Sequence, residues 1–197
     1  MVLFALAPLQ IEAQEKCTSY ENTYVGKSYE IQISSKEKEK FTLYIDAMSL
    51  DRTHEKGGIS IDQKNHQDFL NSLAEAKLKY EEWVKTAKDN NVKELDKSMS
   101  VKSKANGYFL YGSKWNFQFS INLKFDFKIL ESKDETKYLL LVRTGELQSS
   151  SNQFMKVDGF VLVFSSSKEI DDFAAIISTD KVNEFINKPK KEALFKD

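Results

Sequence analysis

The chain is poor in the residues that most often carry chemistry: it has one cysteine, two histidines and seven glycines among 197 residues. A single cysteine, Cys17, excludes a disulfide within the chain and any CxxC metal or redox motif. His54 is followed by Glu55 but not by a second histidine at the zinc-protease spacing. His66 falls in the first turn of a predicted helix, where we expect a solvated or capping role. We therefore predict no catalytic residue, no metal site and no cofactor.

Motifs for nucleotide and acyl chemistry are also missing, since the sequence contains no GxGxxG, no P-loop and no GxSxG. The 29 basic residues nearly balance the 30 acidic ones, and only Arg52 and Arg143 are arginines, so we predict no nucleic-acid partner. A small hydrolase that uses surface carboxylates stays an alternative. It would require acids such as Asp46, Asp51 and Asp62 to converge, whereas most carboxylates on a protein surface are simply solvated.

The N-terminal residues differ in character from the rest of the chain. An apolar run within Met1–Ala13 leads abruptly into polar sequence, which is typical of a signal peptide with cleavage before Gln14. The run is too short for a permanent membrane span, so we expect no integral membrane segment. We interpret residues 1–13 as a signal-peptide remnant and expect an exported protein, periplasmic or extracellular. The alternative is a buried N-terminal strand or helix.

The clearest pattern lies between Trp115 and Ile129, where every odd position is apolar and every even position is polar. A period of two over fifteen residues predicts one long strand with a dry face and a wet face. Gly112-Ser113 just before it suits the centre of a type II′ turn, because glycine tolerates positive φ. The preceding stretch, residues 92–106, is less regular and predicts a short helix.

The remaining periodicity predicts an α+β fold. Strands are expected at residues 29–34, 41–47, 59–61, 108–111, 138–147 and 157–164, a long amphipathic helix at about 62–90, and two short helices after Ser166. We predict a curved antiparallel sheet of six to seven strands, in the order β-β-β-α-β-β-β-β-α-α, packed on the long helix. Residues 138–142 and 160–164 are apolar on both faces, so the C-terminal helices should cover part of the other face. Residues 14–187 would form a single domain, followed by a mobile tail at 188–197.

The Ala13-Gln14 junction, the abundance of lysine and asparagine, and the small α+β pattern resemble those of uncharacterised exported proteins of Bacteroidetes-type bacteria. The resemblance implies export and a small α+β fold. It carries no activity, because it includes no functional motif. The cationic residues that normally open such a signal are missing from this chain.

Binding is easier to motivate than catalysis. Aromatic side chains gather around the Gly112 turn, polar ones follow on the wet margin of the long strand, and a flexible polar loop lies further on. The candidate binding residues are Tyr108, Tyr111, Trp115, Asn116, Gln118, Ser149, Ser150 and Asn152. The alternatives are ordinary sheet packing and a plain connector. We expect a non-enzymatic binding or interaction domain for an unknown protein or glycan partner in the cell envelope. A carrier of apolar ligands is the other alternative beside the hydrolase.

Overall fold

The structure is a computed structural model that describes residues 14–37, 40–132 and 135–187; the predictions for residues 1–13 and 188–197 lie outside it. Its helices are α1 (Gln63–Asp89), α2 (Ser167–Ile176) and α3 (Thr179–Ile186). Its strands are β1 (Glu15–Asn22), β2 (Lys27–Glu37), β3 (Lys40–Asp46), β4 (Met48–Ser49), β5 (Gly57–Asp62), β6 (Leu95–Tyr111), β7 (Lys114–Glu131), β8 (Thr136–Arg143), β9 (Leu147–Gln148), β10 (Lys156–Val157) and β11 (Phe160–Phe164).

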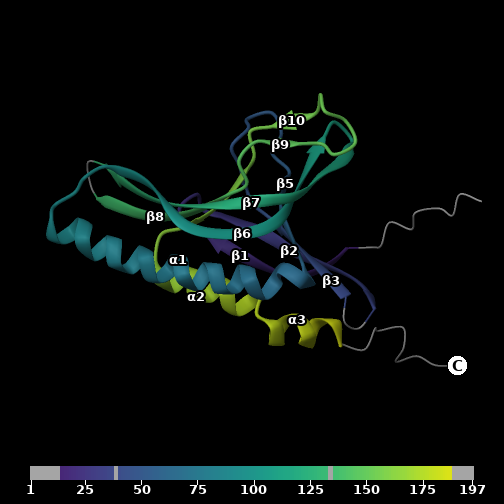
Figure 1. Cartoon of the computed structure of the whole chain (residues 1–197), viewed down its shortest axis with the longest axis horizontal. Helices are drawn as coiled ribbons and strands as arrows, with labels where there is room; N and C mark the ends of the chain where they lie inside the picture. The colour runs from purple at the N-terminus through teal and green to yellow at the C-terminus, as the bar shows by residue number, and fades with distance from the viewer. Residues whose placement is uncertain (1–13, 38–39, 133–134, 188–197) are drawn as a thin grey trace, which may run out of the picture.

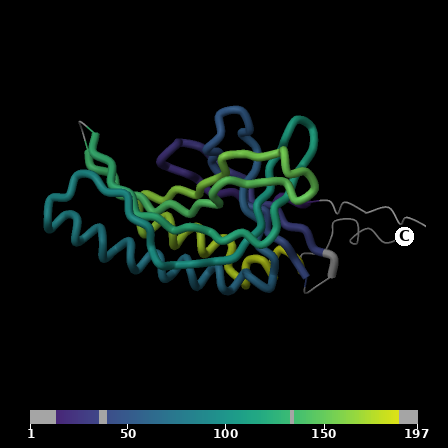
Figure 2. Tube along the Cα trace, turned by 45° about the horizontal axis from the view of Figure 1, so that its top comes forward, coloured from purple at the N-terminus to yellow at the C-terminus, as the bar shows by residue number. Residues whose placement is uncertain are grey.

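Nine strands form one antiparallel sheet in the order β1-β2-β3-β5-β6-β7-β8-β11-β4, and β9 and β10 form a separate pair. The run that makes β3 continues through Ala47 into β4, which pairs with β11 at the far edge. The third strand of the order and the last one thus come from a single segment of chain, so the sheet must curl to bring its far edge back to β3. The curled sheet lies over the helices, as Figures 1 and 2 show from two directions.

The α+β class and the large antiparallel sheet are confirmed, but the strand count is higher than six to seven. Part of the difference comes from β1, in a polar segment where no strand was predicted. As an edge strand, β1 has a free side, where charged residues are usual. Residues 95–106 belong to β6 and are not a short helix. The buried side chains there are Met99, Val101 and Ala105, and they alternate with exposed Lys102 and Lys104. This is a period of two, but the many polar residues around it obscured the pattern.

The long helix was predicted closely, and its apolar stripe fills the inner face of the sheet. Phe69, Leu73 and Ala76 of α1 are fully buried there. The C-terminal helices lie on the same side, next to α1 (Figure 1), where Lys77 Nζ of α1 is 2.6 Å from a carboxylate oxygen of Asp171 in α2. The prediction that they cover the opposite face was therefore wrong. The outer apolar residues of β8 and β11 instead form a small cluster of their own: Leu139, Val161 and Val163, with Met48, Leu130 and Leu141 packed against it.

His66 links α1 to α2 and is not solvated. Its ring is buried edge-on against Phe41, with centroids 5.3 Å apart, and its Nε2 lies 2.7 Å from the carbonyl oxygen of Ile177. Ile177 is the C-cap residue of α2, so His66 caps a helix other than its own. Burial lowers the pKa of His66 below its ordinary value of 6.5, and the bond to Ile177 opposes this shift only partly.

Acidification should weaken the fold through His66. An unfolded histidine takes up its proton near pH 6.5, whereas folded His66 does so only at a lower pH, so its contribution to stability is complete above about pH 6.5 and is lost as the pH falls toward the folded pKa. Urea denaturation at pH 7.5 and 5.5 should show a smaller pH dependence in His66→Gln than in the parent chain. Equal pH dependence in both proteins would contradict this assignment.

Candidate functional site

One irregularity in the β6–β7 hairpin decides which side chains reach the surface. Ala105 of β6 pairs with Ile121 of β7, whereas Gly107 pairs with Gln118. Two steps along β6 thus correspond to three along β7, and the extra residue forms a β-bulge. Ser120 lies in this bulge with φ of 57°, a left-handed conformation that is rare for a non-glycine residue. Across the bulge, the inward-facing positions of β7 change from odd to even numbers.

The exposures of the side chains follow this change. Ile121 through Ile129 keep the predicted dry face at odd positions. Beyond the bulge, Asn116 is only 6% exposed, whereas Trp115 is 51% and Phe119 is 63% exposed. The prediction of one dry face from Trp115 to Ile129 is therefore right for its second half and wrong for its first.

The outward-facing rings lie in two contacting groups that we together call the aromatic surface. Tyr44 of β3, Tyr108 of β6 and Trp115 of β7 form one group, and Phe117 and Phe119 of β7 form the other. Tyr44 meets Tyr108 edge to face at 5.5 Å between centroids, and Tyr108 meets Trp115 at 5.7 Å. Phe117 and Phe119 are nearly parallel, with centroids 6.4 Å apart. The contacts fix the rings in place, because each neighbour restricts the rotamers of the next.

Tyr108 supports this surface from below. It is buried, and its hydroxyl donates a hydrogen bond of 2.6 Å to Oδ1 of Asp46. Burial raises the pKa of Tyr108 well above its usual value, and the nearby Asp46 raises it further. Burial also raises the pKa of Asp46, although the bond from Tyr108 acts in the opposite direction. The candidate residue Tyr108 thus anchors Trp115, which lies above it and is exposed.

The β9–β10 pair, which we call the ribbon, packs against the inner side of the hairpin. A Cβ at Gly107 would lie 2.5 Å from the end of the Leu147 side chain, so glycine at this position lets the ribbon pack closely against β6. Oε1 of Gln118 accepts a bond of 2.7 Å from the backbone N–H of Gln148, and Ser150 N–H donates to the carbonyl of Phe117 at 2.8 Å. Gln118 therefore holds the ribbon.

Asn116 is likewise turned inward, because it pairs with the fully buried Phe109 across the hairpin. Its Nδ2 donates to the carbonyl of Lys114 at 2.9 Å. The sequence had placed Asn116 and Gln118 on the wet margin of the strand. That placement was wrong for both residues, and the bulge at Ser120 is the reason.

The polar loop of the ribbon is internally ordered. Ser149 is buried, and its Oγ lies 3.0 Å from Oγ of Ser151. Asn152 accepts a bond from the N–H of Phe154 through its side chain, which is an Asx turn. Ser150 is exposed, and Phe154 at 83% is the most exposed of the large apolar side chains in the described residues. Sequence reasoning missed Phe154, although a lone aromatic within a polar loop is a usable signal.

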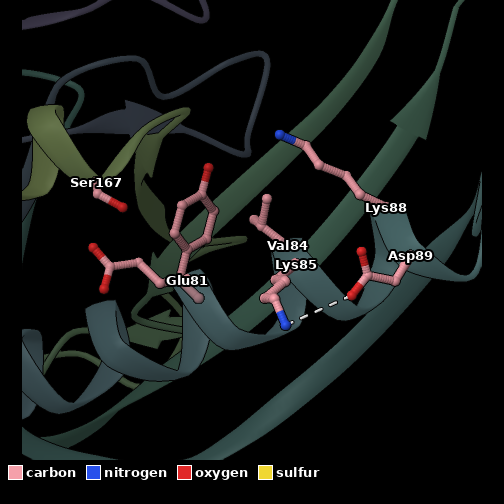
Figure 3. Close-up of a pocket in the computed structure, with 7 residues that line it drawn as sticks. Glu81, Val84, Lys85, Lys88, Asp89 and Ser167 are labelled. Atoms are coloured by element: carbon pink, nitrogen blue, oxygen red, sulfur yellow. Dashed lines mark ion pairs between the residues drawn. The ribbon is translucent and has the colours of Figure 1, made fainter.

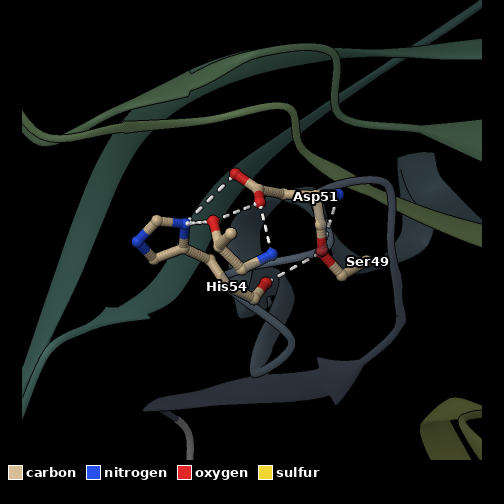
Figure 4. Close-up of polar contacts among 4 residues, drawn as sticks. Ser49, Asp51 and His54 are labelled. Atoms are coloured by element: carbon tan, nitrogen blue, oxygen red, sulfur yellow. Dashed lines mark hydrogen bonds and ion pairs between the residues drawn. The ribbon is translucent and has the colours of Figure 1, made fainter.

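A second polar cluster lies in the loop between β4 and β5 (Figure 4). Oδ1 of Asp51 accepts bonds from the N–H and hydroxyl of Thr53 at 2.7 and 2.6 Å, and these bonds lower the pKa of Asp51 to about 2. Nδ1 of His54 lies 2.8 Å from the Thr53 hydroxyl and 3.1 Å from Asp51. Oγ of Ser49 contacts the backbone carbonyls of Asp51 and His54, so it is not placed as a nucleophile beside the imidazole. The His54 ring stacks on Tyr111 at 4.5 Å.

The three candidate acids have separate partners. Asp46 is bound to Tyr108, Asp51 to Thr53, and Asp62 accepts bonds from Thr42 and Asn106 at 3.1 Å each. Asp62 is also the N-cap residue of α1, but its carboxylate makes no capping bond. The hydrogen bonds of these acids fix them in place rather than directing them at one another.

A surface hollow of about 340 Å³ lies between the second half of α1 and Ser167 at the start of α2 (Figure 3). The Tyr80 hydroxyl lies 3.0 Å from the carbonyl oxygens of Tyr138 and Ser165, and burial raises the pKa of Tyr80 to about 12. Lys85 and Asp89 form an ion pair of 3.8 Å at its rim. The phenol therefore joins the helices to the sheet and stays protonated.

Comparison with known families, curated proteins and solved structures finds no match to this chain. Over the part of the chain that the structure describes, no helix is both long and apolar enough to cross a membrane. Within the same residues, no three histidine, cysteine or acidic side chains gather closely enough to hold a metal ion.

The bulge can be tested by substitution at Ser120. Ser120→Val should lower the free energy of unfolding by about 1–2 kcal/mol, because a β-branched residue is strained at positive φ, while Ser120→Gly should leave it unchanged or raise it. Asn122→Val, on the same strand but without positive φ, is the matched control. Chemical denaturation measures all three, and an equal effect of valine at both positions would refute the left-handed conformation.

The anchoring role of Tyr108 makes a separate prediction. Tyr108→Phe should destabilise the fold by about 1–3 kcal/mol, because it removes a hydrogen bond to a partly buried carboxylate. Tyr44→Phe, which keeps the ring contact, should cost much less. Urea denaturation compares the two variants, and similar losses would show that the Tyr108–Asp46 bond is not what anchors the surface.

Proposed function

We propose that this chain is a non-enzymatic binding domain whose contact area is the aromatic surface of the β6–β7 hairpin. The observation that carries the proposal is the exposure of Trp115 and Phe119, 51% and 63%, on a strand whose other apolar residues are largely buried. Contiguous exposed aromatic area usually marks an interaction site, because its removal from water is favourable. Tryptophan and other aromatic side chains also contribute most strongly at the centres of interfaces.

The rigidity of the surface supports this function. Trp115 rests on Tyr108, and Phe117 stacks with Phe119. The carbonyl of Phe117 is also held by Ser150 of the ribbon. Association with such a surface costs little conformational entropy, since the contacting rings are already ordered before a partner arrives.

The partner that we propose is a protein or glycan of the cell envelope. The apolar run at Met1–Ala13 supports export, and the near-balance of charge, a net −1, gives no field that would attract nucleic acid. The hydrolase alternative is weakened by the separate partners of Asp46, Asp51 and Asp62. The carrier alternative has less support, since side chains of α1 fill the inner face of the sheet.

The double variant Trp115→Ala, Phe119→Ala should keep its fold and lose at least about tenfold in affinity, because interface aromatics often contribute 2 kcal/mol or more. Leu78→Ala is the matched control: Leu78 is 66% exposed, but lies on α1. Immobilised chains would be compared for the retention of envelope proteins and on an array of envelope glycans, and the dissociation constant of the retained partner would be measured by calorimetry. Equal retention by the double variant and the parent chain would refute the proposal.

A further inference from the structure

A second hollow, of about 630 Å³, lies between α1 and the first half of β6 and shares no lining residue with the aromatic surface. We call it the α1–β6 groove. β5 pairs with β6 only near Gly57–Ser60, so the helix rather than a strand flanks β6 at the groove. Oγ of Ser72 in α1 donates to the carbonyl of Lys102 at 2.9 Å and fixes the two walls relative to each other. The volume is within the range of small-ligand sites.

The two walls of the groove carry opposite charges. Asp68 and Glu75 line the α1 side, and Lys102 and Lys104 line the β6 side. Among the described residues, Asp68, Lys102 and Lys104 make no ion pair with any side chain, and Glu75 has only a loose, exposed contact with Lys79 at 3.8 Å. Charges of both signs thus remain available across one concave surface.

Ser103 adds an independent sign of a site. It lines the same groove between the two lysines, is 5% exposed, and its Oγ is shielded from solvent without a hydrogen-bond partner. A buried polar atom without a partner costs free energy and calls for an explanation. A polar group bound in the groove that reached this hydroxyl would supply the missing partner.

We infer that the α1–β6 groove binds a short peptide with free termini. The ammonium end of such a peptide complements Asp68 and Glu75, and its carboxylate end complements Lys102 and Lys104. A phosphate or another purely anionic ligand would meet the acidic wall, and a purely cationic ligand would meet the lysines. The amide of Asn122, which also lines the groove, can donate to and accept from a peptide backbone.

This site is separate from the aromatic surface, so the two can be tested independently. The probe is triglycine, which carries both terminal charges at neutral pH, and N-acetyl-triglycine amide is the same backbone without them. In NMR titrations of the full chain, triglycine should shift the backbone amides of Ser103 and Asn122 in a saturable way. The capped peptide should bind at least about tenfold more weakly, because it lacks both charge contacts.

Substitutions then test how much each charged wall of the groove contributes to triglycine binding. Lys102→Gln with Lys104→Gln, or Asp68→Asn, should weaken triglycine binding several-fold, while Lys128→Gln on β7 should leave it unchanged. Ser103→Ala should weaken both the free and the capped peptide, since it removes an uncharged contact. Equal binding of the two peptides, no saturable shift at the groove, or saturation by maltotriose but not by triglycine would overturn the inference.

Discussion

The left-handed residue at Ser120 is the constraint on which the surface of this protein depends. It inserts one residue into the longest hairpin and exchanges the inner and outer sides of β7 beyond it. Because of that exchange, Trp115 and Phe119 face outward, whereas Asn116 and Gln118 face inward. The ribbon can then pack on the hairpin, since Gln118 offers its side-chain oxygen to the backbone of Gln148. Without the bulge, three aromatic rings would occupy the place of the ribbon.

Periodicity predicted the regular elements well because α1 and the second half of β7 each bury one uninterrupted face. It could not reveal the bulge, since Phe119 and Ile121 are both apolar and the alternation runs across Ser120 without a break. A residue type says that a side chain is suited to burial, but not whether the backbone turns it inward. The position of the C-terminal helices was undetermined for a similar reason: strands with two apolar faces, such as β11, give no preference between them.

The candidate residues take different roles in the structure. Trp115 is exposed on the aromatic surface, whereas the backbone N–H of Ser150 donates to the carbonyl of Phe117 from the ribbon. Tyr108, however, is an anchor, and Tyr111 stacks on His54, a contact across more than fifty positions of sequence that no local pattern encodes. Phe154 escaped attention because a single aromatic in a loop has no period. Long-range contacts of this kind depend on how the sheet curls, which is decided by all of its strands together.

The exchange of inner and outer sides at Ser120 lowers the stability of the fold. Fully burying a large apolar side chain such as phenylalanine is worth about 1.5–3 kcal/mol, so leaving Trp115 and Phe119 exposed forgoes part of the stability that burial would provide. The inward amides of Asn116 and Gln118 return less, because a hydrogen bond contributes only about 1 kcal/mol net. Local choices that lower stability without a packing benefit are concentrated at functional sites. The same reasoning applies to Ser103, whose buried hydroxyl has no hydrogen-bond partner among the described residues. Both places therefore support the two binding proposals, because each departs from the arrangement that stability alone would favour.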